Sequence, residues 1–217
     1  MEHFFDENYR EFEVYEFTYP SGWDDTSFYQ QEKPNSEEVL NLVSTVEPSD
    51  MESVNSLVSQ LCLCDIEVNE ENMVLVDKVI TQLVRFASIS NEETDCSSAS
   101  MELENAELAM TTILYALDGK NEFIYASVFN AGIFDTMLRS YELYSPKIQS
   151  LVFLILAKFV ISGDDKFVKK VFSNRFGQFA ITQYIDPSGN EQKNAIVEFL
   201  LVFIHRIMGI QDLRETG

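Results

Sequence analysis

The chain has 217 residues, of which 46% are hydrophobic and 24% charged, so it can bury a core in one or two domains. Only 8 glycines and 5 prolines are present, which disfavours a turn-rich sandwich or barrel and favours helices joined by short loops. The net charge of -21 disfavours nucleic acid and anionic lipid as partners, because 26 of the 36 acidic residues fall in residues 1–118, against four basic ones. Such a surface attracts a partner with a basic surface, or it only maintains solubility.

Residues 1–35 are acidic and aromatic together, and they show neither a helical period nor sustained alternation. Ten aromatic side chains, Trp23 among them, are interleaved with Asp and Glu and with few aliphatic residues. This composition cannot build a core, so we predict a disordered acidic-aromatic tail. Either Trp23 and the other aromatics dock into a groove of a partner, or the tail is a plain leader or lies back on the helical body. The first residues lack the basic and apolar regions of a signal peptide.

Apolar residues recur with a helical period after the tail. Ser49 and Glu52 have the spacing of a capping box, in which each side chain satisfies the other residue's backbone N–H. Asn69 is predicted to cap a helix that runs to Phe86. The polar stretch Ser88–Ser100 is predicted to be a loop, either a plain linker or a phosphorylation site.

The odd number of cysteines predicts free thiols in a reduced compartment. Cys62 and Cys64 lie two positions apart in a helical pattern, which separates them by roughly 200° around the helix axis. They therefore point to opposite sides and cannot share a metal ion. Cys96 lies in the polar stretch, and we expect no metal site.

From about residue 101 the helices repeat. Two successive units each contain a short helix, a break, a second short helix and a long third one. The second unit follows the first at a period of 43 to 44 residues, with these pairs of positions: Gly119 and Gly163, Phe123 and Phe167, Val128 and Val171, Phe129 and Phe172, Tyr141 and Tyr184, Gln149 and Gln192. This period belongs to the armadillo and HEAT range. No such unit can bury its apolar face alone, so we expect the units to stack.

Specific residues carry a resemblance to armadillo repeats across roughly Met101–Met208. Ser145-Pro146-Lys147-Ile148-Gln149, followed by Gly163-Asp164-Asp165 and Val171-Phe172, resembles the plan of one repeat, and Asn130-Ala131-Gly132-Ile133 resembles the junction inside it. The resemblance implies an all-α, right-handed α-solenoid of three-helix repeats. It also implies a non-enzymatic scaffold, adaptor or regulatory subunit that binds other proteins.

The peptide receptors of this family, the nuclear-import adaptors and the β-catenin group, share a ladder of asparagine and tryptophan on the long helices. The asparagine positions here hold Leu114 or Tyr115, Lys158 or Phe159, and Val202 or Phe203; the tryptophan positions hold Met110 or Thr111, Leu154 or Ile155, and Glu198 or Phe199. The ladder is missing. A divergent nuclear-transport adaptor that holds basic cargo through acidic side chains is the alternative function.

Sequence motifs of catalysis are missing as well: there is no GxxxxGK[ST], GxGxxG, HExxH or CxxC. His205 is the sole candidate base outside the tail, so an α-helical enzyme that depends on His205 is a third reading. Asp164 and Asp165 fit the start of a helix, where the dipole favours an acid. We expect no enzyme activity, no catalytic residue and no cofactor.

Two features of the last unit are candidate partner-binding sites. Lys166, Lys169 and Lys170 fall on one helical face and could hold an acidic partner or the tail, or only face solvent. The last helix, which includes Phe199 and Phe203, is apolar nearly all round, which is typical of a helix buried on most sides. No polar capping repeat follows it, so we expect it to stack on a partner or a second copy, or the chain to be part of a longer solenoid.

The sequence thus predicts a tail (residues 1–35), an armadillo-like domain (residues 36–210) and a short C-terminal tail (residues 211–217). The apolar stretches Leu151–Ile161 and Ala195–Ile210 are too short or too interrupted by charge to span a bilayer. We expect a soluble protein of the cytoplasm, the nucleus or both, bound to other proteins and to no membrane.

Overall fold

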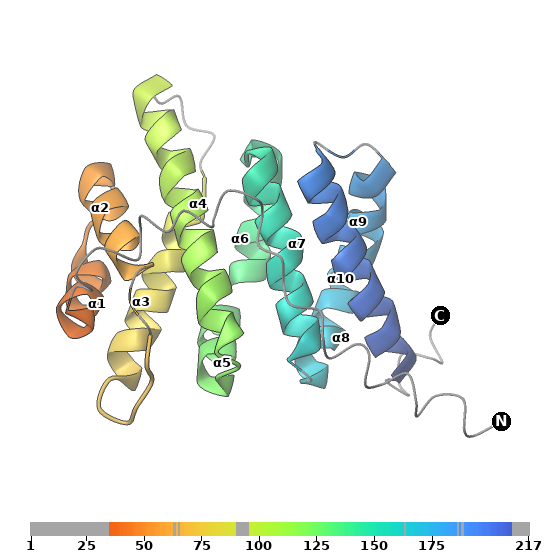
Figure 1. Cartoon of the computed structure of the whole chain (residues 1–217), viewed down its shortest axis with the longest axis horizontal. Coiled ribbons are helices and arrows are strands. Elements are labelled where there is room, and N and C mark those ends of the chain that lie inside the picture. The colour runs from red at the N-terminus through yellow and green to blue at the C-terminus, as the bar shows by residue number, and fades with distance from the viewer. Residues whose placement is uncertain are drawn as a thin grey trace. The chain divides into compact units, whose positions relative to one another are not determined.

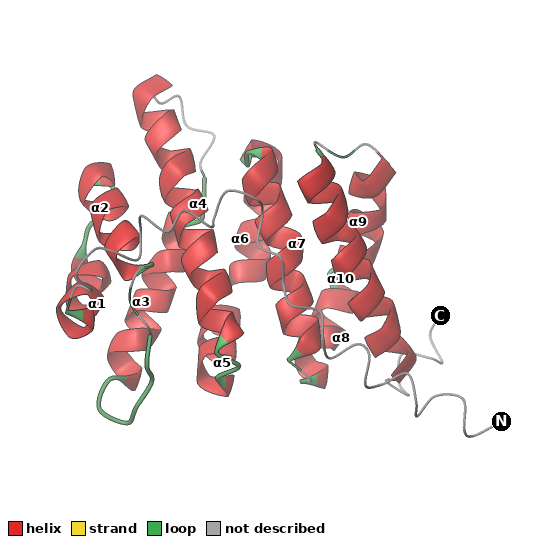
Figure 2. Ribbon diagram, in the orientation of Figure 1, coloured by secondary structure: helices red, strands yellow, loops and turns green. Residues whose placement is uncertain are grey.

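In a computed structural model, the described residues are 35–62, 64, 66–89, 96–162, 164–185, 187 and 189–209, without the side chains of 96–98 and 209. All of them belong to one compact unit. Throughout this part of the chain every regular element is a helix (Figures 1 and 2). The elements are α1 (Ser36–Thr45), α2 (Met51–Leu61), α3 (Met73–Phe86), α4 (Cys96–Asp118), α5 (Glu122–Asn130), α6 (Ile133–Ser140), the 3-10 helix η4 (Tyr141–Leu143), α7 (Pro146–Ile161), α8 (Asp165–Ser173), α9 (Phe176–Ile185) and α10 (Asn190–Gly209). The predicted all-α class is confirmed.

The helices of this body lie in two layers. α2, α4, α7 and α10 pack side by side in that order, and the contact between α7 and α10 is the most extensive (Figure 1). α3 packs against α1, α4, α5 and α6, and α9 packs against α8 and α10, so the shorter helices form the other layer. The core lies between these layers, where α7 buries twelve of its side chains.

Two successive three-helix units, α5–α6–α7 and α8–α9–α10, begin and end where local signals predict. Asn121 and Asp164 cap α5 and α8 through their side-chain oxygens, and Ser145 caps α7 with proline at the next position. Gly132 separates α5 from α6 with a φ of 86°, a left-handed conformation that glycine adopts without a steric penalty. The predicted break at Gly132 and the restart at Ser145 are confirmed.

Two local predictions are wrong. The cap of α2 is Asp50, whose carboxylate accepts a hydrogen bond from the Ser53 N–H, so Ser49 and Glu52 form no capping box. Residues 96–100, predicted as loop, are the first part of α4. α9 begins at Phe176, directly after a turn of two residues, Asn174 and Arg175.

The prediction that Asn69 caps the helix α3 is wrong, because Asn69 lies three residues before the cap position. Its side-chain oxygen accepts from the N–H groups of Glu71 and Asn72, which holds the turn that leads into α3, while the cap position itself is Asn72. The helix then runs to Phe86, as the apolar period predicts.

Buried hydrogen bonds join the two units at Gln149 and Gln192, which lie 43 residues apart. Gln192 Nε2 donates to Gln149 Oε1 at 2.9 Å and to the Tyr141 hydroxyl oxygen at 2.7 Å. Gln149 Nε2 in turn donates to the Tyr141 carbonyl oxygen at 3.2 Å. Burial raises the pKa of Tyr141, and the bond from Gln192 opposes this. These bonds fix the register of α10 on α7, because each unpaired polar group would cost about 1–3 kcal/mol.

Several predictions fall outside the described residues: the disordered tail with Trp23, the C-terminal tail 211–217, and the Cys96 side chain. Cys62 and Cys64 both carry free thiols. Burial raises the pKa of the Cys62 thiol, which lies 2.7 Å from the Thr112 hydroxyl. Among the helices that the structure describes, none has the length and apolar character to cross a membrane.

Candidate functional site

The outer side of the last two helices exposes large apolar side chains. Ile181 and Ile185 lie one turn apart on α9, and their side chains are 55% and 80% exposed. Leu201 and Ile204 lie on α10, at 63% and 55%. We call these four residues the outer face. Single exposed apolar residues are common on protein surfaces, but a cluster on two packed helices is typical of an interaction surface.

In the preceding unit, aromatic rings contact the unit that follows. Phe134 on α6 packs edge-on against Phe176 of the next unit, with 5.5 Å between ring centroids. Tyr141 meets Phe179 of the next unit in the same way, at 4.7 Å. Ile181 lies four residues after Gly177, which occupies the position 43 residues after Phe134. The counterparts of the two covered rings, Phe134 and Tyr141, are therefore Gly177 and Tyr184, and Tyr184 is 39% exposed.

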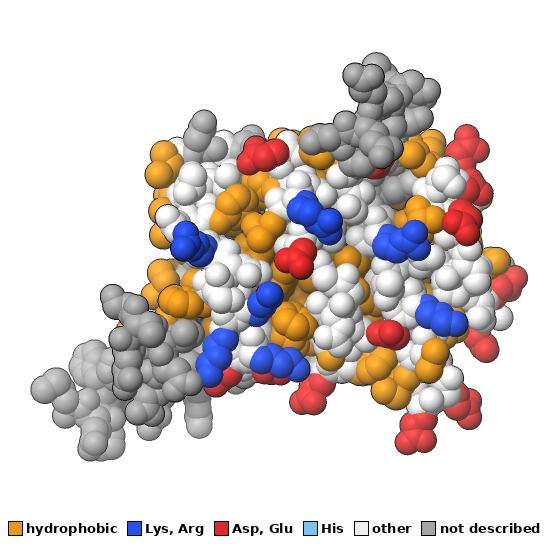
Figure 3. Space-filling model, turned by 180° about the vertical axis from the view of Figure 1, so that it is seen from behind, with side chains coloured by type: hydrophobic (Ala, Val, Ile, Leu, Met, Phe, Trp, Pro, Cys, Tyr) orange, Lys and Arg blue, Asp and Glu red, His pale blue; other side chains and the backbone are white. Residues whose placement is uncertain are grey.

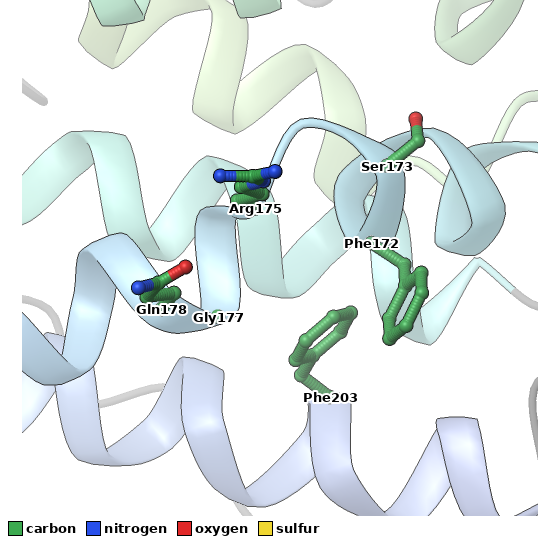
Figure 4. Close-up of a pocket in the computed structure, with 6 residues that line it drawn as sticks. All are labelled: Phe172, Ser173, Arg175, Gly177, Gln178 and Phe203. Atoms are coloured by element: carbon green, nitrogen blue, oxygen red, sulfur yellow. The ribbon is translucent and has the colours of Figure 1, made fainter. Parts of the chain in front are cut away.

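A cavity of about 360 Å³ opens beside this outer face, between the turn that joins α8 to α9 and the helix α10 (Figure 4). The rings of Phe172 and Phe203 lie close together at its wall, as Figure 4 shows. The lining residues are Phe172, Ser173, Arg175, Gly177, Gln178 and Phe203. Its size falls at the lower end of known binding pockets, which span roughly 300–1,000 Å³.

Gly177 allows the Phe203 ring to lie against α9 at the wall of this cavity. A Cβ at this position would lie 2.6 Å from Cε1 of the Phe203 ring, so any larger residue would displace that ring. Glycine thus lets α10 place an aromatic side chain directly against the backbone of α9.

Arg175 holds a backbone conformation that favours glycine. Its φ is 59°, and the position 43 residues earlier is Gly132, whose φ is 86°. A left-handed conformation costs a side chain with a Cβ about 1–2 kcal/mol. The chain therefore keeps an arginine at the edge of the cavity at some expense in stability, which is a pattern typical of functional positions.

The predicted lysine cluster lies on α8, and all three side chains are exposed. Lys166 Nζ lies 3.0 Å from Asp164 Oδ2 and 4.6 Å from the centroid of the Phe167 ring, so part of its charge is compensated. Burial acts to raise the pKa of Asp164, but hydrogen bonds from the Lys166 N–H and side chain, together with its charge, lower it overall. Lys169 and Lys170 project from the following turn. Figure 3 shows such basic side chains spread among hydrophobic ones on this side of the molecule.

Two of the predicted partner-binding residues are not exposed. Phe199 is 0% exposed and packs against Phe153 of α7, and Phe203 is 5% exposed. The prediction that they form a free docking surface is corrected: α10 turns both rings toward the body and presents Leu201 and Ile204 instead. An apolar pattern on all sides of a helix gives no signal for which side faces inward.

His205 lies exposed on α10. A buried His205 would have excluded an enzyme that depends on it, so this third interpretation stays a prediction. Among the described residues, no group of three or more His, Cys, Asp or Glu side chains is placed to hold a metal ion.

The face formed by α4, α7 and α10 carries a charged cluster at the ladder positions. Lys158 of α7 forms an ion pair with Asp118 at the end of α4. Glu198 of α10 lies nearby and half-buried; burial raises the pKa of its carboxyl group, and the charge of Lys158 opposes this shift. Burial, together with the charge of Asp118, also raises the pKa of the Tyr125 hydroxyl to about 12.

Sequence reasoning found the lysines of α8 but missed the residues of the outer face and of the cavity. The period pairs Arg175 with Gly132 and Gly177 with Phe134, which marks two positions where the last unit differs from the preceding one but not the meeting of the cavity residues. Comparison of the chain with family models, with curated proteins and with solved structures finds no match.

Proposed function

We propose that this chain is a non-enzymatic interaction module, a scaffold, adaptor or regulatory subunit of armadillo-like type. In this proposal the helices form a right-handed α-solenoid, and the protein acts in the cytoplasm or nucleus by binding other proteins. One observation carries the proposal: the large apolar side chains of Ile181, Ile185, Leu201 and Ile204 on α9 and α10 are each more than half exposed.

The packing inside the body supports a stacking partner. Between the two units, aromatic rings meet across the boundary at 4.7–5.5 Å, and Phe153 of α7 also approaches Phe199 of α10. Each large apolar side chain that is fully covered contributes about 1.5–3 kcal/mol. Covering Leu201, Ile204 and their neighbours on α9 would therefore provide a useful share of the free energy of association.

The alternative of basic cargo has less support. On the face that such cargo would use, Lys158 occupies a ladder position and places a positive charge there. Asp118 is already paired with it, which leaves fewer acidic groups for a basic peptide.

The proposal predicts that Leu201→Glu combined with Ile204→Glu abolishes association through the outer face. Two charges on a surface that must lose its water are costly, whereas both positions are exposed in the free chain, so folding should change little. The measurement is sedimentation of the full chain with affinity capture from its source cell, quantified for wild type and variant.

Asn194→Glu serves as the matched control, because it adds a charge to the same helix at another exposed position. We expect the wild type and Asn194→Glu to retain the same bound proteins or second copies. The double variant should lose them. Equal association for all three chains, with the same melting temperature, would remove the outer face as a binding surface.

A further inference from the structure

We propose that a second copy of this chain covers the outer face, with the two α10 helices packed antiparallel about a two-fold axis between Leu201 and Ile204. The inference rests on the proposed function, since it names the partner for the same surface. Three observations carry it: the spacing of the exposed apolar side chains on α10, the position of the acidic residues in the chain, and the apolar area that α9 adds.

The exposed apolar side chains of α10 form one stripe along the helix. Each of them is exposed by more than a third of its surface, and they are Val197, Leu201, Ile204 and Met208. Intervals of four, three and four residues place them on one side of the helix, in the spacing of the positions that meet when two helices pair. The opposite side of α10 packs against α7, α8 and α9. We call these four residues the α10 stripe.

The α10 stripe is complementary to a reversed copy of itself, because its intervals read the same from either end. A two-fold axis midway between Leu201 and Ile204 brings Leu201 of one copy opposite Ile204 of the other. The same axis brings Val197 opposite Met208, so the smallest side chain meets the longest one and the contact is filled evenly. Antiparallel helices also place opposite ends of their dipoles together. Such a contact uses the same patch on both copies and closes after two.

The acidic residues lie where they disturb this contact least. Of the 36 acidic residues, 26 fall in residues 1–118, whereas residues 119–217 hold 10 acidic and 11 basic ones. α10 ends the row α2, α4, α7, α10, so α4 lies two helix spacings away from it, about 16–20 Å (Figure 1). Repulsion between exposed charges is largely screened beyond about 8 Å at physiological ionic strength. Two copies can therefore meet at α10 although each has a net charge of -21.

The apolar side chains of α9 extend the contact to the area that a dimer needs. A stable contact buries about 800 Å² on each partner, which four side chains of one helix do not supply. On α9, Ile181, Tyr184 and Ile185 are also exposed by more than a third. Lys193, one turn before Val197, lies with its Nζ 5.2 Å from the centroid of the Tyr184 ring, so the exposed side of α9 adjoins α10. A second copy brings a matching apolar surface of two helices.

The test is sedimentation equilibrium of the full chain at concentrations up to about 100 μM, where even a weak dimer is populated. We expect an equilibrium between monomer and dimer. Leu201→Glu and Ile204→Lys should each weaken dimerisation at least about tenfold, because each substitution places two charges in a contact that must lose its water. A rise in ionic strength should strengthen the wild-type dimer, since the contact is apolar and the chains carry like charge.

A mixture of the Leu201→Glu chain with the Ile204→Lys chain tests the register. Antiparallel pairing places the new carboxylate of the first chain opposite the new ammonium of the second, and it keeps the apolar pair on the other side of the axis. The matched control mixes Leu201→Glu with Leu201→Lys, whose charges would meet only in a parallel pair. We expect the first mixture to form the mixed dimer at least about tenfold more strongly than the control. Equal recovery in both mixtures would exclude the antiparallel register.

A wild-type chain that stays monomeric over this range would overturn the inference, as would a dimer that neither charged variant weakens. Thermal midpoints equal to that of the wild type would show that the variants are folded. If the chain is monomeric but Leu201→Glu combined with Ile204→Glu loses captured proteins, another protein covers the outer face, and the proposed function stands without this inference. If neither dimerisation nor capture depends on these side chains, the proposed function fails as well.

Discussion

At the scale of single residues, the same left-handed backbone conformation occurs at two corresponding positions with different side chains. Gly132 and Arg175 end corresponding short helices in the left-handed region, and only the first is glycine. Gly132 follows the ordinary rule that a helix end with positive φ selects a residue without a Cβ. Arg175 departs from that rule at a position that lines the cavity.

Substitutions at Gly132 and Arg175 should change the free energy of unfolding in opposite directions. Gly132→Ala should lower the free energy of unfolding by about 1 kcal/mol, because no atom lies within 4 Å of the added Cβ and only the backbone strain acts. Arg175→Gly should raise it by about 0.5–1 kcal/mol, since relief of strain exceeds the added freedom of the unfolded chain. Urea denaturation of both variants measures the two changes. A loss of stability in Arg175→Gly would mean that the guanidinium supports the fold.

At the scale of helices, buried polar pairs set how neighbours fit. The bond from Gln192 to Gln149 lies between α10 and α7, and both groups also contact Tyr141. We predict that Gln192→Leu lowers the free energy of unfolding by about 1–3 kcal/mol, because Gln149 Oε1 loses its partner inside the core. A double-mutant cycle with Gln149→Leu should show a coupling of about 0.5–3 kcal/mol. Additive effects would show that the two helices hold their register without this pair.

Glu198 supplies a pH dependence at the same scale. Its carboxyl pKa is raised by burial, so the folded chain binds the proton more tightly than the unfolded chain. Stability from this group is therefore full below the unfolded pKa and is lost as the pH rises through the folded pKa. Glu198→Gln should raise the melting temperature at pH 7, and this gain should shrink as the pH falls toward the ordinary range of a glutamate. A gain that stays constant with pH, measured by thermal melts at several pH values, would contradict the shift.

At the scale of the whole molecule, the two units differ in what covers them. The unit α5–α6–α7 is covered by the unit that follows it, whereas the outer side of α9 and α10 shows Ile181, Ile185, Leu201 and Ile204 to its surroundings. The loss of association predicted for the charged variants of Leu201 and Ile204 belongs to this scale, since it tests whether stacking continues with a partner.

The sequence by itself determined the helices of the last two units and their order. Caps such as Ser145 and Asp164, the break at Gly132 and the 43-residue period are local or repeating signals, which act through the backbone wherever the rest of the chain lies. The period even related Gln149 to Gln192, which meet in the structure.

Tertiary structure alone decided which side of α10 is available and where the cavity lies. An apolar helix carries no period that marks its inner side, so only packing on α7 showed that Phe199 and Phe203 turn inward and Leu201 and Ile204 outward. The cavity needs Phe172, Gly177 and Phe203 from three helices, and no local signal encodes their meeting. Contacts between segments far apart in the chain depend on how the helices pack. For this reason the helices could be predicted from the sequence, whereas the positions of the exposed face and the cavity could not.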